Sequence, residues 1–162
     1  MNKSRLLRFC LGLSMLLLIT LSGYAVLAAA PLSGNPIPCT NGMAGEYPCA
    51  GVDLISQMPL DTIGAEDSTV KGNDHWGWTD TQTGKEYVLF GLTNGVSFID
   101  ISDPANPIYL GKLPSHVGAS VYRDVKVYQD VAYIVADNIP GHGLQMFDLT
   151  ELRTVVNPPV TF

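Results

Sequence analysis

The side chains of this 162-residue chain that could do chemistry are three histidines and a few aspartates. They stand beside glycine or aromatic residues, in segments that we expect to be loops or strand ends: Asp74, His75, His116, Asp124 and His142. If these segments meet on one face of the fold, their imidazole and carboxylate groups could hold a divalent metal ion, and no other cofactor is indicated. No H-x-x-x-H spacing holds two ligands together locally. The sequence therefore favours the other interpretation, in which His116 and His142 are exposed and Arg123 pairs with Asp74 or Asp124.

Three aromatic residues lie close together in the sequence and allow two interpretations. Trp76, Trp78 and Tyr87 could form a platform for a sugar or a peptide, or they could pack in the core between sheets. Aromatic residues at this density favour the core. The sequence contains no G-x-S-x-G motif, no phosphate-binding loop and no dinucleotide-binding pattern, so it offers little support for an enzyme.

Two cysteines, Cys39 and Cys49, lie within the segment PCTNGMAGEYPC. Glycine and proline between them allow the chain to turn back, which favours a disulfide in an exported protein. A metal site is the alternative, but it needs two more ligands.

The N-terminus is typical of an export signal. Three basic residues precede a long apolar run that ends in small residues, which predicts a signal peptide over residues 1–28, cleaved after Ala28, and an extracellular or cell-surface location. An uncleaved anchor from Phe9 to Ala30 is the alternative, and it is the only route by which we expect the chain to meet a membrane. Without residues 1–28 the chain has six Lys and Arg against fifteen Asp and Glu, a balance that disfavours nucleic acid as a partner.

An internal repeat predicts the fold. The segment GVSFIDISDPANPIYLG, which begins at Gly95, recurs in similar form 48 residues later as GLQMFDLTELRTVVNPPV, which begins at Gly143. A period of this length, with four short strands in each unit, is typical of β-propeller blades. Asp100 and Asp148 occupy the same place in both copies, and we expect each to accept hydrogen bonds from the backbone of the following turn.

The repeat and the turn residues divide the mature chain into two parts. We expect residues 29–70 to be an irregular, disulfide-tied lead in which 52–60 could form a strand that docks on a blade. Residues 71–162 should be all-β, with about two to two and a half propeller-like blades of four antiparallel strands. The eight strand candidates are HWGWTD, KEYVLFGL, GVSFIDIS and PIYLGKL, then SVYRDVKVY, VAYIVAD, GLQMFDLT and NPPVTF. One helical turn is expected at 150–153.

We expect several apolar residues to need neighbours on both faces of their strands. They are Val96, Phe98, Ile99, Phe147 and Leu149. With only two blades, we expect one of these faces to stay open, so that residues 29–162 alone would aggregate or dimerise. The chain would then be the N-terminal portion of a longer protein.

The landmarks CTNGMAGEYPC, NDHWGWTD, GVSFIDISDPANPIYLG, YRDVKVY and GHGLQMFDLTELR resemble the choice-of-anchor B family of bacterial β-propellers with LVIVD repeats. The resemblance spans Cys39 to Arg153 and implies an exported or surface-attached propeller with an interchangeable C-terminal anchor and no established activity. The chain departs from the family in lacking later blades and the anchor, and in carrying Tyr122 where tryptophan is expected. We therefore expect a module that binds an extracellular protein or glycan; the alternatives are a metal-dependent propeller hydrolase and a non-functional truncated remnant.

Overall fold

The computed structural model of the protein describes residues 30–162. The predicted signal peptide and its cleavage site lie outside these residues. Within the described part the chain forms short β-strands and two short 3₁₀ helices, which confirms the all-β class. No helix in this part is long and apolar enough to span a membrane.

The first sheet contains the four strands that the sequence predicts. They are β3 (Gly72–Thr79), β4 (Glu86–Leu92), β5 (Gly95–Asp100) and β6 (Ile108–Pro114), paired antiparallel in chain order. The turn between β5 and β6 begins with Asp103, whose carboxylate accepts the backbone N–H of Ala105 at 3.1 Å. The backbone N–H of Asn106 also donates to the carbonyl of Asp103 at 3.0 Å, so a side-chain bond and a backbone bond both stabilise the turn, as expected of aspartate before proline.

Strand β5 is buried along its whole length because both of its faces are covered. Phe98 points toward the second sheet, where its ring stacks on Phe147 with 4.8 Å between ring centroids. On the opposite face the hydroxyl of Ser97 donates to the backbone carbonyl of Ile63, in the segment that precedes β3. The predicted burial of this strand on both faces is therefore confirmed.

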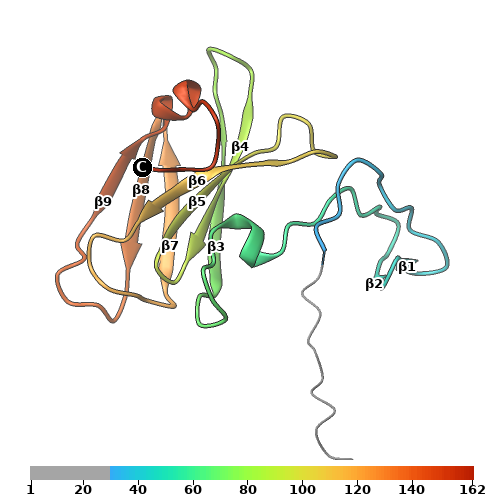
Figure 1. Ribbon diagram of the computed structural model, residues 1–162, viewed down its shortest axis with the longest axis horizontal. Coiled ribbons are helices and arrows are strands. Elements are labelled where there is room, and N and C mark those ends of the chain that lie inside the picture. The colour runs from blue at the N-terminus through green and yellow to red at the C-terminus, as the bar shows by residue number, and fades with distance from the viewer. Residues whose placement is uncertain (1–29) are drawn as a thin grey trace, which may run out of the picture.

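The second sheet contains β7 (Arg123–Tyr128), β8 (Val131–Ala136) and β9 (Gln145–Asp148), again antiparallel. It lies beside the first sheet, with β7 next to β3 (Figure 1). Buried residues of both sheets form one core, which includes Leu89, Phe98, Val125, Ile134 and Phe147. After β9 the chain forms the 3₁₀ helix η2 (Leu149–Thr154), in the place of the predicted helical turn.

The last strand candidate pairs with a different sheet from the one we expected. Strand β10 (Val160–Thr161) runs parallel to β6 and becomes the fifth strand of the first sheet, so the second sheet has three strands and not four. The physical reason lies in Phe162, whose ring packs edge-on against both Phe98 and Phe147, with 5.2 Å between centroids in each pair. Burying this ring between the sheets draws the strand toward β6.

The apolar residues that were expected to stay open are buried. Phe98 and Leu149 are completely inaccessible, and Val96, Ile99 and Phe147 are nearly so. The expectation of an open face at these five positions is wrong, because the two sheets and Phe162 cover one side of β5 and the segment before β3 covers the other.

The N-terminal lead has more structure than an irregular segment. Cys39 and Cys49 form the predicted disulfide, with 5.9 Å between their Cα atoms, around the hairpin of β1 (Met43–Ala44) and β2 (Tyr47–Pro48). The stretch 52–60 does not dock on a sheet as a strand. It instead makes antiparallel bridges within the lead, Ile37 with Leu54 and Leu32 with Gln57, before the 3₁₀ helix η1 (Leu60–Ile63).

Candidate functional site

The first polar cluster lies where β3 and β7 run side by side. Strand β3 has an irregular register between Gly72 and His75, where one extra residue bulges out of the ladder. The bulge places the carboxylate of Asp74 against the second sheet, where it accepts the backbone N–H of Val125 at 3.0 Å and the ammonium of Lys126 at 2.8 Å. The hydrogen bond and the positive charge from Lys126 lower the pKa of Asp74 despite partial burial, so it stays ionised at neutral pH.

Trp76 is the exposed aromatic residue of this cluster. Its side chain is 41% exposed, and the ammonium of Lys126 lies over its ring at 4.5 Å from the centroid. Because Lys126 also pairs with Asp74, the lysine is held by both residues, and its position over the ring is favourable as a cation–π contact. We call Asp74, Trp76 and Lys126 the inner-edge cluster.

The other two aromatic residues of the proposed platform are in the core. Trp78 and Tyr87 are buried and stacked on each other, with 5.1 Å between ring centroids. Burial also raises the pKa of the Tyr87 hydroxyl. A three-residue platform is therefore not formed, because β3 and β4 turn these two side chains toward the second sheet, and only Trp76 remains open to a ligand.

A second cluster surrounds Arg123 at the start of β7. This arginine is fully buried, and its guanidinium donates to the carbonyls of Leu92 at 2.9 Å and Thr93 at 3.3 Å and to Nε2 of His142 at 2.9 Å. Burial lowers the pKa of Arg123, although a guanidinium remains charged in proteins. The expected pairing of Arg123 with Asp74 or Asp124 is wrong, since none of these contacts is with a carboxylate.

The two loop histidines lie together at this arginine. Since Arg123 donates to Nε2 of His142, that nitrogen must carry a lone pair, and Nδ1 is left to donate to the carbonyl of Gly143 at 3.1 Å. The ring of His116 lies tilted against that of His142, with 4.7 Å between ring centroids, and its Nε2 bonds to the His142 carbonyl at 2.7 Å. His142 is therefore buried and fully bonded, contrary to the expectation of an exposed loop residue, while His116 is exposed.

The predicted metal ligands do not assemble. Within residues 30–162 no three His, Cys, Asp or Glu side chains come together in a group that could hold a metal ion. The structure brings His116 and His142 together, but it holds Asp74 on Val125 and Lys126 and leaves His75 and Asp124 exposed on strands β3 and β7.

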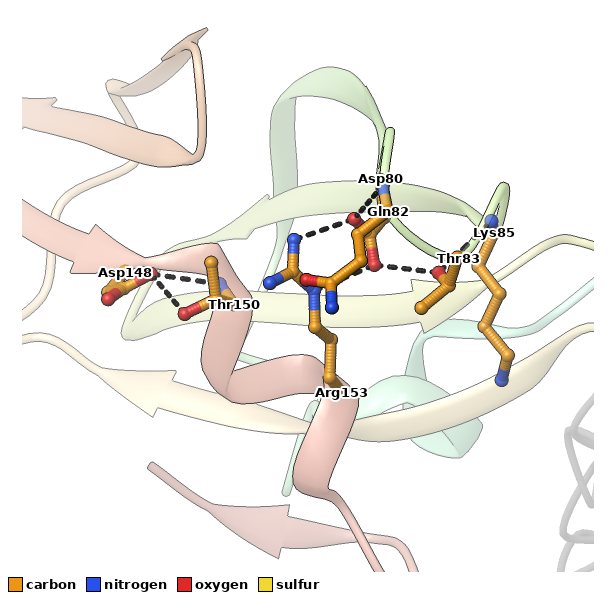
Figure 2. Close-up of polar contacts among 7 residues, drawn as sticks. All are labelled: Asp80, Gln82, Thr83, Lys85, Asp148, Thr150 and Arg153. Carbon is orange, nitrogen blue, oxygen red and sulfur yellow. Dashed lines mark hydrogen bonds and ion pairs between the residues drawn. The ribbon is translucent and has the colours of Figure 1, made fainter.

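The third cluster joins the turn after β3 to the 3₁₀ helix η2. Asp80, at the end of β3, is inaccessible to solvent, and its two carboxylate oxygens accept the guanidinium of Arg153 at 2.7 and 2.8 Å (Figure 2). The same carboxylate accepts the hydroxyl of Thr83 at 2.6 Å and the backbone N–H of Gln82 at 2.9 Å. These bonds, above all the one from Arg153, hold the pKa of Asp80 far below its usual range.

The repeated aspartates have the architectural role that the sequence predicts. Asp100 accepts the backbone N–H of Ser102, and Asp148 accepts that of Thr150, each at 2.9 Å. Burial alone would raise the pKa of Asp100, but the bonds from Ser102 and Lys85 outweigh it and leave this pKa lowered. These bonds occur at equivalent places in the two units.

Sequence reasoning missed the pair of Asp80 and Arg153, which are 73 residues apart. The only available signal was local: Asp80 precedes Thr83 and Gly84, a typical turn in which aspartate accepts backbone hydrogen bonds. Nothing in that signal points to an arginine in a distant turn. The position of Lys126 over Trp76 likewise depends on two strands that are not adjacent in the chain.

We also compared the chain with known proteins. No family model, no curated protein and no solved structure matches the chain.

Proposed function

We propose that the protein is an exported or cell-surface β-repeat module that binds an extracellular glycan or protein through the inner-edge cluster. The single observation that carries this proposal is the exposure of Trp76 beside two charged groups that hold each other in place. Large aromatic side chains are normally buried, as Trp78 and Tyr87 are here, so an open tryptophan in an ordered strand is available for recognition.

The chemistry of the cluster suits a polar ligand with an apolar face. An indole ring offers a flat surface on which the C–H face of a sugar or a peptide side chain can stack, and its N–H can donate a hydrogen bond. Asp74 and Lys126 add an acceptor and donors beside the ring. Their ion pair also limits the motion of Lys126, which lowers the entropy lost when a ligand binds.

Export and family remain parts of the proposal. The basic and apolar N-terminus supports secretion, and the disulfide fits an oxidising compartment. The motifs from Cys39 to Arg153 support membership of the choice-of-anchor B family. Such a protein would act at the cell surface by binding.

The test is a binding screen with matched variants. The mature protein is screened against arrays of glycans and extracellular peptides, and the affinity of any ligand found is then measured by calorimetry for the original chain, for Trp76→Ala and for Tyr47→Ala. Tyr47 is a similarly exposed aromatic residue on the distant β1–β2 hairpin. We expect Trp76→Ala to weaken binding by roughly tenfold or more, which corresponds to a loss of about 1.4 kcal/mol. Equal affinities for all three proteins would refute the role of the cluster.

A further inference from the structure

A pocket of about 400 Å³ lies in η1 and in the loop that joins it to β3 (Figure 1). A volume of this size is in the range of small-molecule sites. Its lining combines three apolar residues with three carboxylates: Leu60, Ala65, Val70, Asp61, Glu66 and Asp67. We call this hollow the loop pocket.

The floor of the loop pocket is apolar and fixed. Ala65 and Val70 are buried, and together with Leu92 of β4 they form a small core of their own. Leu60 and Phe90 pack against this core. The floor is therefore a preformed surface on which an aliphatic group can be buried, and such burial releases water and favours binding.

Hydrogen bonds tie both ends of the loop to neighbouring strands and turns. Glu66, early in the loop, accepts the amide of Asn94 at 2.7 Å and the ammonium of Lys112. At the other end the backbone N–H of Lys71 donates to the hydroxyl of Thr93 at 2.8 Å, and the Lys71 carbonyl accepts the Thr93 N–H at 2.9 Å. Because the loop is already ordered, a ligand does not lose affinity by ordering it.

Two carboxylates of the loop pocket have oxygen atoms without a partner. Glu66 is neutralised by Lys112, but Asp61 is exposed and accepts no hydrogen bond from any described residue. Asp67 binds the N–H and the hydroxyl of Thr69 through Oδ1, so within residues 30–162 its Oδ2 accepts no hydrogen bond. The bonds from Thr69 lower the pKa of Asp67, which is therefore ionised at neutral pH.

One further positive charge lies among the lining residues. The ammonium of Lys71 donates to the carbonyl of Ser68 at 2.6 Å and forms no ion pair with a described residue, so Asp61 and Asp67 outnumber it. Within the described chain no three side chains converge in a group that could hold a metal ion. An organic cation matches both parts of the lining, because its ammonium donates to carboxylates and its carbon chain covers the floor.

We propose that the loop pocket binds a small organic cation with an ammonium group and an aliphatic part. The ammonium lies between the carboxylate of Asp61 and Oδ2 of Asp67, and the aliphatic part lies on the apolar floor. A free alkylamine and the lysine side chain of a peptide share this chemistry. No residue of the inner-edge cluster lines the loop pocket, so either proposal can fail without the other.

The test is a titration of the mature protein with hexylammonium, followed through the NMR shifts of the backbone amides. Hexanol and hexanoate are the matched neutral and negative probes, because they carry the same aliphatic chain without the positive charge. We expect hexylammonium to shift the amides of residues 60–71 and to saturate them, with a dissociation constant of roughly 1–10 mM. Hexanol should bind at least about threefold more weakly, and hexanoate should not bind.

Charge reversal at one carboxylate tests where the ammonium lies. Asp61→Lys should weaken hexylammonium binding by about fivefold or more, whereas Glu151→Lys, the same change at an exposed position in η2, should not affect it. Neither carboxylate accepts a hydrogen bond from a described residue, so both variants should keep the fold, which their amide spectra show directly. Asp61→Asn keeps the shape of the side chain and should weaken binding by about twofold to threefold.

Two short peptides distinguish the sources of the ammonium group. A capped glycine–lysine–glycine peptide presents it on a lysine side chain, and the same peptide with norleucine presents the carbon chain alone. Binding of the lysine peptide assigns the site to a protein ligand, and binding of hexylammonium alone assigns it to a free amine. The proposal is overturned if hexylammonium causes no saturable shift at residues 60–71, if hexanol binds as tightly, or if Asp61→Lys and Glu151→Lys bind it equally well.

Discussion

At the scale of single residues, the inaccessible Asp80 and the half-buried Arg153 form an ion pair that should stabilise the fold. Arg153 binds both oxygens of the carboxylate, and Thr83 and the backbone of Gln82 supply two further bonds. Arg153 also lies over the ring of Trp78 at 6.0 Å. Removing one member of such a network leaves the other buried without a partner, which costs more than the lost contact alone.

We predict that Asp80→Asn lowers the midpoint of thermal unfolding by several degrees at pH 7. The pKa of Asp80 is lower in the folded than in the unfolded protein, so its contribution is fully present above the unfolded pKa of about 4. This stabilisation is lost as the pH falls from about 4 toward the folded pKa. The original chain and the variant should therefore differ less in their unfolding midpoints in that pH range. Calorimetric scans from pH 7 to pH 2 measure the difference.

Asp103→Asn is the control for this prediction. Asp103 starts a similar turn and bonds Ala105 and Asn106, but it is exposed and has no arginine partner. Its substitution should change the midpoint much less at every pH. If Asp80→Asn lowers the unfolding midpoint by the same amount at every pH from 7 down to 2, the carboxylate charge is not what stabilises the fold.

At the scale of elements, the short strand β10 depends on a glycine in its neighbour. Gly111 of β6 has a φ of 145°, and a Cβ at this position would collide with the backbone of Val160. The close approach allows Val160 to pair with Gly111 and the N–H of Phe162 to bond the carbonyl of Lys112 at 3.0 Å. Strand β10 then holds the ring of Phe162 against Phe98 and Phe147.

We predict that Gly111→Ala releases β10 from the first sheet. The new methyl group cannot share space with the Val160 backbone, so the amide of Phe162 should lose its protection from hydrogen exchange. The free energy of unfolding should fall by roughly 1–3 kcal/mol as the contacts of Phe162 are lost. Gly77→Ala in β3 is the matched control, because its Cβ would meet only the Tyr87 carbonyl at 4.0 Å. Unchanged protection of Phe162 in Gly111→Ala would contradict the assigned pairing.

At the scale of the whole molecule, the two sheets share one hydrophobic core. Phe98 of the first sheet, Phe147 of the second and Phe162 after β10 form an aromatic group in which each ring contacts the other two. Neither sheet can lose this group without exposing the other. We therefore expect the sheets to unfold in one cooperative transition.

We predict that Phe98→Ala destabilises both sheets together, by about 3–5 kcal/mol, as expected for a large cavity in a core. Denaturant unfolding should remain a single transition, and the most protected amides of β4 and β8 should lose equal protection in hydrogen-exchange measurements. Val156→Ala, at the most exposed of the large apolar residues, should change the free energy of unfolding by no more than about 0.5 kcal/mol. If β4 loses protection in Phe98→Ala while β8 retains it, the sheets are separate folding units.

Local patterns in the sequence were sufficient for the strands, the turns and the disulfide. Apolar alternation and turn residues predicted β3 to β9, because side-chain period and turn chemistry act over a few residues. The 48-residue repeat predicted that Asp100 and Asp148 would bond the following turn, and the Gly- and Pro-containing segment between Cys39 and Cys49 predicted their pairing.

Contacts between distant segments were decided only by the tertiary structure. The sequence alone could not show that Arg153 binds Asp80, that the Lys126 ammonium lies over one face of Trp76 or that His142 accepts a bond from Arg123, since each pair joins different strands or turns. It placed the final strand in the second sheet, whereas burial of the Phe162 ring directs that strand to β6. The repeat predicted an open apolar face at five residues that the structure buries, namely Val96, Phe98, Ile99, Phe147 and Leu149. Packing of one sheet on the other buries Phe98 and leaves its equivalent, Met146, in solvent, because only one of two like faces has a neighbour in the described chain.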